Sequence, residues 1–199
     1  MKISIFSNAN FPFVPSRLPF FYGWWILFFT TLGMMASIPG QTMGVGVYID
    51  YLIQSTNLTR LQISMSYMIG TILSSLLLPL AGRYYDIYGS RVMIFVAGAG
   101  LGISLFMLSE SFNLINLTQT LFPGLSPVAN GILVMTLIFL LLRQFGQGIM
   151  AMVSLNTLAK WFDSRRGLVS GISGIFVSFS FAVAPLFMNV LIEGYSYPG

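Results

Sequence analysis

The 199-residue sequence contains no cysteine and no histidine, and it has only five acidic residues. Without cysteine the chain has neither a disulfide nor a thiolate nucleophile, and without histidine it lacks a common metal ligand and the most frequent acid/base catalyst. Five scattered carboxylates give little basis for a catalytic acid pair. We therefore expect no metal site, no cofactor and no enzymatic activity.

Charge is also scarce. Charged residues make up 7% of the chain and hydrophobic residues 56%, and the mean hydropathy is +0.84. A soluble domain has about 25% charged residues, so the composition indicates a polytopic protein whose surroundings are a lipid bilayer. The basic residues lie between apolar segments, where orientation signals belong, so the pI near 9.6 does not indicate a nucleic-acid partner.

Five apolar stretches are long enough for membrane-spanning helices, which need roughly 20 residues each. The predicted fold is therefore an all-α bundle of about five transmembrane helices covering residues 22–199, preceded by a leader, residues 1–21, that contains three prolines. The predicted helices are 22–50, 61–83, 91–110, 132–158 and 167–192.

Local signals support these boundaries. Thr59 and Gln62 have the spacing of a capping box at the start of the second helix, and Ser90 is a candidate cap for the third. Residues 111–130 contain Pro-Gly and Ser-Pro turn dipeptides and are predicted to form a long polar connection. Stripes of small residues predict close helix packing; on the second helix they are Ser66, Gly70 and Ser74.

The basic residues outside the helices fall mostly on one side of the predicted topology. That side has seven: Lys2, Arg17, Arg83, Arg91, Lys160, Arg165 and Arg166. The other side has Arg60 alone. By the positive-inside rule we expect a multi-pass protein of the cell (plasma or inner) membrane with a cytoplasmic N-terminus.

Arg143 is the exception, because it lies inside the fourth predicted helix, where a charge costs about 2.5–3.5 kcal/mol. Gln147 and Ser154 share its face in a regular α-helix, which predicts a polar line toward a cavity. The alternative is a buried carboxylate partner, but no Asp or Glu lies deep in a predicted helix. We favour a water-filled path in which Arg143 attracts an anion.

The first predicted helix offers a facing surface with Gln41 and Tyr48. Pro39 stands just before Gln41 and predicts a kink, because proline removes a helical hydrogen bond. Gly40, Gly44 and Gly46 then permit close approach of another helix or bending. A broken helix beside a polar face is typical of a midplane binding site, and a simple packing kink, with Gln41 bonded to a neighbouring carbonyl, is the alternative.

The segment GRYYDIYGSR, residues 82–91, resembles the loop between helices two and three of the major facilitator superfamily. Four positions match the motif: Gly82, Asp86, Gly89 and Arg91. The resemblance implies that these residues gate the cytoplasmic side, with Arg165 and Arg166 of WFDSRRG supplying partner charges. Arg143 with Gly146 and Gly148 is similar to the helix-four motif of the same superfamily.

A narrower resemblance is to the monocarboxylate and oxalate:formate branch, carried by the aromatic cluster Tyr22-Gly23-Trp24-Trp25. It implies that Gln41, Tyr48, Arg143 and Gln147 line a site for a small organic anion, transported with a coupling proton or in exchange for another anion.

Members of the superfamily have twelve helices in two halves, so the five predicted helices are expected to be an incomplete N-terminal half that needs a missing C-terminal half. The expected function of the full-length protein is secondary active transport by alternating access. The alternative is a non-transporting membrane fragment, or an assembly or sensor protein derived from a transporter half. An intramembrane enzyme is a weaker third option, because neither HExxH nor GxSxG occurs.

Overall fold

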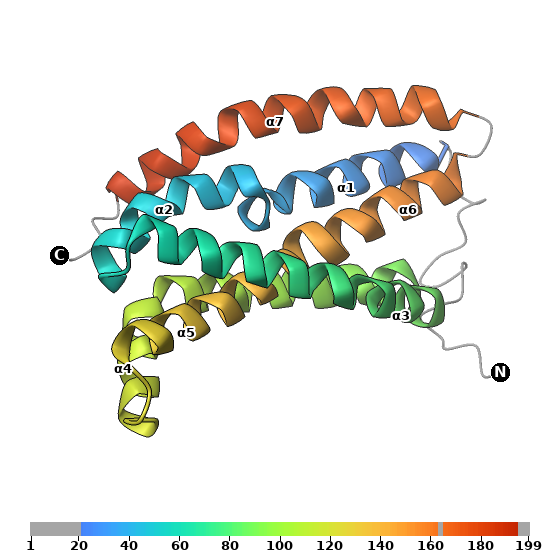
Figure 1. Cartoon of the computed structure of the whole chain (residues 1–199). Helices are drawn as coiled ribbons and strands as arrows, with labels where there is room; N and C mark the ends of the chain where they lie inside the picture. Colours follow the sequence, from blue (N-terminus) through green and yellow to red (C-terminus); the bar gives the residue numbers. More distant parts are fainter. Residues whose placement is uncertain (1–20, 163–164, 195–199) are drawn as a thin grey trace.

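The computed structural model describes residues 21–162 and 165–194. Apart from Phe21, the predicted leader lies outside the described residues. Within them the chain is helical and contains no β-strand, which confirms the all-α bundle predicted from the sequence. Figure 1 shows long helices running roughly along one direction, as expected of segments that cross a bilayer.

The first predicted span is interrupted in the structure. It consists of α1 (Gly23–Ala36), the short 3-10 turn η3 (Ile38–Gly40) and α2 (Thr42–Thr56). The break predicted at Pro39 is confirmed, since this proline lies in η3 and the next residue, Gln41, is extended. With 14 residues α1 is too short to span a membrane alone. The two short helices therefore act as one broken rod.

The next helix, α3 (Arg60–Ser109), begins at the predicted capping box. The Thr59 side chain accepts from the Gln62 backbone N–H, and the Gln62 side chain accepts from the Thr59 N–H at 2.8 Å. Its 50 residues would measure about 75 Å as a straight helix, more than twice the roughly 30 Å of a hydrocarbon core. It is therefore two spans.

The two arms of α3 meet at Gly89, which has φ 79° and ψ 173° while its neighbours stay helical. Figure 1 shows the arms, cyan-green and light green, running in opposite directions. The loop expected between the second and third helices is thus reduced to a turn at one residue. Gly82 contributes no such turn, because it is helical and a Cβ there would meet nothing within 4 Å.

The long polar connection predicted for residues 111–130 is wrong. The structure has the helix α4 (Ser111–Leu121) there, followed by a short turn before Pro127. Leu114 and Ile115 of α4 pack against the main core, and the Asn130 side chain donates to the Ile115 carbonyl at 2.9 Å. Two adjacent apolar residues and one buried amide therefore hold the segment as a helix despite its polar composition.

A continuous rod follows, made of α5 (Pro127–Leu142), the π-helical segment η4 (Arg143–Met150) and α6 (Ala151–Trp161). It lies at the centre of the core. Met135, Ile138, Phe139 and Leu142 are each 0% exposed, and both arms of α3 contribute residues to the same cluster. The spacing of three and four residues puts these α5 side chains on one face of the helix, and this face anchors the bundle.

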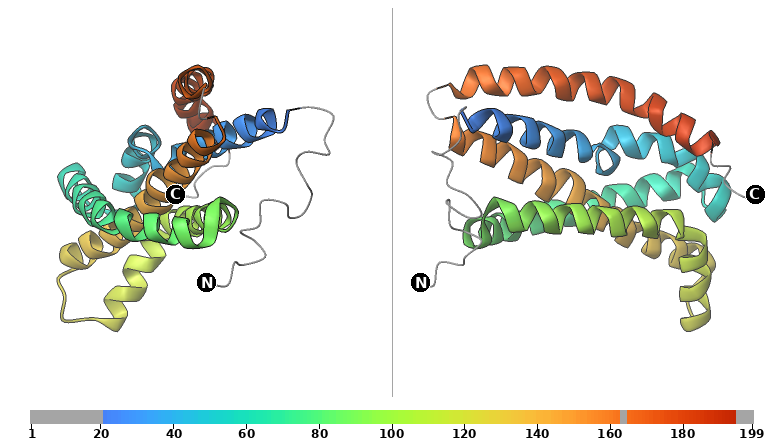
Figure 2. Two further views of the ribbon diagram at one scale, coloured as in Figure 1. Left: turned by 90° about the vertical axis from the view of Figure 1, so that its right-hand side faces the viewer. Right: turned by 180° about the vertical axis from the view of Figure 1, so that it is seen from behind.

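The last helix, α7 (Arg166–Gly194), lies at the edge of the bundle beside α1 and α2 (Figure 2). Only 6% of the residues in its most apolar stretch are buried, against 44% in the stretch of the α5–α6 rod. A hydrogen bond from Thr31 Oγ1 to Ser173 Oγ, 2.9 Å long, joins it to α1. Most of its surface is therefore available to lipid or another helix.

The broken rod crosses η4 at two glycines. A Cβ on Gly40 would lie 2.6 Å from the Leu142 carbonyl oxygen and 2.7 Å from the Gly146 Cα, and a Cβ on Gly146 would lie 2.7 Å from the Gly40 Cα. Of the three glycines expected to permit close approach or bending, Gly40 approaches another helix, Gly44 packs against the adjacent turn at Ile38 and Pro39, and a Cβ on Gly46 would meet nothing within 4 Å. This backbone contact puts the break of the first span directly against the segment that begins with Arg143.

Replacing Gly89 by alanine is expected to destabilise the protein by about 1–3 kcal/mol, because a side chain is strained in this region of backbone conformation. Gly82→Ala is the matched control, since that site is helical and open, and alanine favours a helix by up to about 1 kcal/mol over glycine. Thermal unfolding of the detergent-solubilised chain, followed by tryptophan fluorescence, measures both. Equal losses in the two variants would contradict the assigned turn.

Replacing Gly146 by alanine is expected to force the crossing apart at a cost of about 1–3 kcal/mol, because the nearest atom is backbone, which cannot rotate away. Gly148→Ala, in the same π-helical segment, is the control: its Cβ would meet its nearest neighbours at 3.4 Å. Size-exclusion profiles recorded after graded heating compare the variants. A Gly146→Ala protein as heat-resistant as Gly148→Ala would show that the crossing tolerates separation.

Candidate functional site

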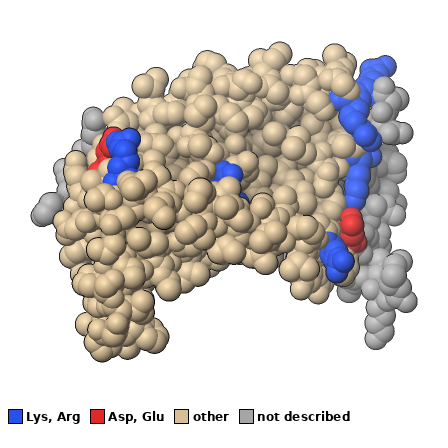
Figure 3. Space-filling view, in the orientation of Figure 1, with Lys and Arg blue, Asp and Glu red and all other residues tan. Residues whose placement is uncertain are grey.

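Arg143 lies near the middle of the α5–α6 rod, as the first residue of η4. The other described basic residues lie near helix ends or near the turn of α3 at Gly89. Figure 3 shows a band of basic side chains at one end of the molecule, a basic group beside an acidic patch at the other, and an isolated blue patch between them. We call the first the Arg91 end and the second the Arg60 end.

The Arg143 guanidinium contacts three helices. Its Nη1 donates to Gln147 Oε1 in the next turn and lies 3.5 Å from Thr42 Oγ1 at the start of α2. Its Cζ is 5.4 Å from the centre of the Tyr67 ring on α3. The Tyr67 hydroxyl is 2.9 Å from Thr42 Oγ1. Four side chains therefore form one polar network at the crossing of α2, α3 and η4.

No carboxylate takes part in this network. In residues 21–162 and 165–194 the ion pairs within 4.0 Å are Arg60 with Asp50 and Lys160 with Asp86. The acid partner considered as an alternative for Arg143 is therefore not found in the described part of the chain. A half-buried guanidinium is left with neutral hydrogen-bond partners and an aromatic face, so its charge can attract an anion.

Of the residues predicted to join Arg143, Gln147 does so. Gln41 instead donates from Nε2 to Ser37 Oγ at 2.8 Å, so it bridges the break in the first span. Tyr48 lines a separate cavity of about 200 Å³ with residues such as Leu105 and Ile192. Of the four predicted residues, Arg143 and Gln147 are therefore in contact. Gln41 and Tyr48 have other neighbours.

Ser154 departs from the predicted polar line. It is 1% exposed, and a Cβ on Gly33 of α1 would lie 2.6 Å from its hydroxyl oxygen, so it faces α1. The cause is η4, because a π-helix takes one more residue per hydrogen-bonded turn than an α-helix. One extra residue turns the following helix by about 100°, which moves Ser154 away from the face of Arg143.

Thr42 and Tyr67 belong to the network but were not identified from the sequence. Thr42 follows the predicted kink directly. Tyr67 adjoins the small-residue stripe of the second helix, where Gly70 packs closely: a Cβ there would be 2.9 Å from the Leu140 nitrogen. The predicted kink at Pro39 was the sequence feature that could have identified Thr42. Nothing in the spacing of Tyr67 pointed to Arg143.

The motif residues at the Arg91 end form a different pair from the one expected. Asp86 lies 4.0 Å from Lys160, both largely exposed. Among the described residues no ion pair within 4.0 Å joins Asp86 to Arg165 or Arg166. Lys160 also lies 4.4 Å from the centre of the Tyr85 ring, which holds it beside Asp86. Arg166 donates to the Ala159 carbonyl at 3.3 Å. Arg91 and Arg165 are exposed at the same end.

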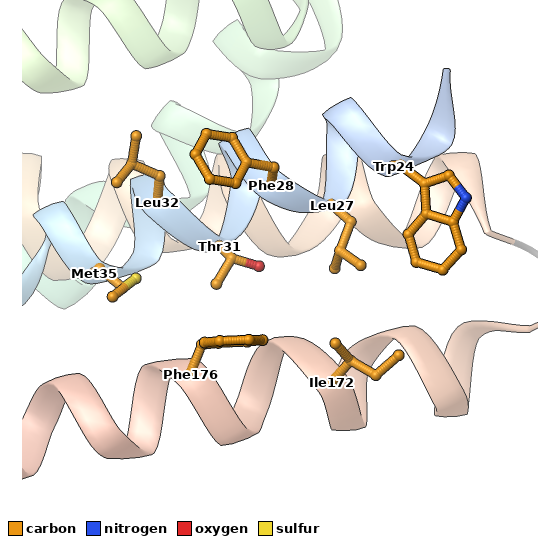
Figure 4. Close-up of a pocket in the computed structure, with 8 residues that line it drawn as sticks. All are labelled: Trp24, Leu27, Phe28, Thr31, Leu32, Met35, Ile172 and Phe176. Carbon is orange, nitrogen blue, oxygen red and sulfur yellow. The ribbon is translucent and has the colours of Figure 1, made fainter. Parts of the chain in front are cut away.

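A larger cavity, of about 530 Å³, lies between α1 and α7. Figure 4 shows Leu27 and Thr31 of α1 pointing toward Ile172 and Phe176 of α7. No charged side chain is among its lining residues. It suits apolar groups, and the Arg143 network remains the candidate for a charged ligand.

The family model described as Major Facilitator Superfamily matches residues 24–199. No curated protein and no solved structure gave a significant match. The matched range includes the Arg143 network, the turn at Gly89 and every described helix except the first residue of α1. The chain therefore belongs to the Major Facilitator Superfamily, a family of membrane transporters.

Proposed function

We propose that the full-length protein transports a small organic anion of the monocarboxylate class by secondary active transport, with Arg143 as the counter-charge. The observation that supports this is a half-buried guanidinium, midway along a membrane-spanning rod, with no carboxylate beside it among the described residues. A charge at such depth costs about 2.5–3.5 kcal/mol on insertion scales. A carboxylate ligand offsets part of that cost by a charge-assisted pair.

The neighbours of Arg143 have distinct roles in this proposal. Gln147 orients the guanidinium through its Oε1, and Tyr67 covers one face of it. Thr42 offers a hydroxyl beside the bound anion. Gln41 and Tyr48, which lie elsewhere along the first span, contact the anion on its way to or from Arg143.

Alternating access supplies the transport step. The motif residues Gly82, Asp86, Gly89 and Arg91 form the gate at their end of the bundle, with Arg165 and Arg166 as further basic groups. A C-terminal half provides the second wall of the pathway, and the driving force is a coupled proton or an exchanged anion.

The orientation proposed from the sequence fits the charge distribution. The turn of α3, the end of α6 and the start of α7 lie at the Arg91 end (Figure 1). These segments carry five described basic residues: Arg83, Arg91, Lys160, Arg165 and Arg166. Arg60 lies at the opposite end. By the positive-inside rule the Arg91 end is cytoplasmic, in the plasma or inner membrane, with the leader 1–21 on that side and residues 22–199 as the membrane bundle.

Arg143→Gln is expected to reduce carboxylate uptake by the full-length protein at least tenfold, because a hydrogen bond to a charged group contributes about 1.5–3 kcal/mol and each 1.4 kcal/mol is tenfold in affinity. Uptake of labelled lactate, acetate and oxalate into proteoliposomes measures the effect. Arg60→Gln is the control, since that pair is exposed and surface pairs contribute little. Unchanged uptake by Arg143→Gln would reject the proposed function.

Tyr67→Leu is expected to raise the KM for the transported anion about two- to fivefold, because it removes a cation–π contact of about 0.5–1 kcal/mol that fixes the guanidinium. Tyr67→Phe keeps the ring and loses only the contact to Thr42, so its KM should change less. Uptake kinetics over a range of substrate concentrations separate the two. Equal KM values for both variants would show that the ring does not position Arg143.

A further inference from the structure

The helix α4 lies across the end of the bundle, whereas the long helices run along it. Figure 1 and Figure 2 show it crosswise to them at the Arg60 end. The arm of α3 that leads into it runs from Ser90 to Ser109. These 20 residues measure about 30 Å as a helix, which is the thickness of a hydrocarbon core. The helix α4 therefore begins where the core ends, at the depth of the lipid headgroups.

The surface of α4 is divided into three faces. One face packs on the bundle through Leu114 and Ile115. A second face is apolar, and its residues Leu117 and Leu121, one turn apart, are 55% and 64% exposed. Phe112, in the first turn, lies between the packed face and the remaining one. That third face is polar and exposed, and it consists of Asn113, Asn116 and Thr120. A helix bordered by protein, lipid and water has this pattern.

Apolar exposure continues along the chain after α4. Phe122, the next residue, is 60% exposed. The Gln119 side chain donates to the Leu125 carbonyl at 2.9 Å, which holds the turn against the helix. From this turn α5 leads into the membrane, and its Leu133 and Leu137 are each 50% exposed. The apolar surface that begins on α4 thus extends to a helix whose exposed side faces lipid, and patches of this kind mark interaction sites.

The segment that carries this surface has no charge. No charged residue occurs between Ser111 and Leu142, and Figure 3 shows the lobe that α4 forms, at the lower left, without a basic or acidic side chain on the face drawn. Charges steer soluble partners and attract anionic headgroups. The helix α4 needs neither effect to stay at the bilayer, because membrane spans hold it at both ends.

We propose that α4 is an interfacial helix, which lies in the plane of the membrane with Leu117 and Leu121 in lipid and with Asn116 and Thr120 in water. In the orientation proposed above, it lies in the outer leaflet. It joins the second arm of α3 to α5 and fixes the depth of both. This inference does not depend on the transported substrate, because α4 shares no residue with the Arg143 network.

Single cysteines that carry a nitroxide test the proposal, because the chain has no native cysteine. Leu117→Cys and Leu121→Cys report on the apolar face, and Asn116→Cys and Thr120→Cys are the matched controls on the polar face. All four side chains are exposed, so each position accommodates a label. The labelled chain is reconstituted into phosphatidylcholine vesicles. Power saturation in electron paramagnetic resonance then measures collisions of each nitroxide with oxygen, which concentrates in lipid, and with a neutral nickel chelate, which stays in water.

We expect the ratio of oxygen to nickel collisions to be about threefold or more higher at both leucine positions than at both controls, because an interfacial helix buries its apolar face by about 5–10 Å. Equal ratios on the two faces would overturn the proposal, since the whole helix would then lie in one medium. Leucine positions that neither reagent reaches would overturn it as well, because a protein segment or a second copy of the chain would cover that face. If one variant is not inserted, the other variant of the same face decides the outcome.

Discussion

The contact between Gly40 and Gly146 fixes where the first span crosses the α5–α6 rod. Each glycine leaves room for the other's backbone, so a broken span and a π-helical segment cross without side chains between them. Small residues permit such approach inside lipid, where helices have no hydrophobic drive toward one another. The crossing brings Thr42 and Arg143 within reach, although they are far apart in the sequence.

The same crossing explains why the charge is tolerated. Arg143 lies next to the break, where the start of α2 offers a side-chain hydroxyl, and where Tyr67 offers an aromatic face from α3. These groups solvate a cation without neutralising it. A buried acid would neutralise the charge and remove its attraction for an anion, so the neutral surroundings agree with the proposed role of Arg143 as a counter-charge.

The sequence predicted the helical class, the break at Pro39, the capping box at Thr59 and the shared face of Arg143 and Gln147, because each depends on local composition or spacing. It failed at α4, where two core contacts and a buried amide outweighed a polar composition. It also failed at Ser154, because an α-helical period was assumed through η4. Tyr67 could not be assigned, since its partner lies on another helix and only the tertiary crossing brings them together.

The turn at Gly89 has a mechanical consequence. In a helical hairpin whose loop has several residues, one helix can tilt while its neighbour stays still. Here a single residue joins the two arms of α3, and both arms pack against the α5–α6 rod. A tilt of the first arm must therefore be absorbed by one pair of backbone angles or passed on to the second. The two arms therefore share one glycine joint, through which a movement of either arm acts on the other.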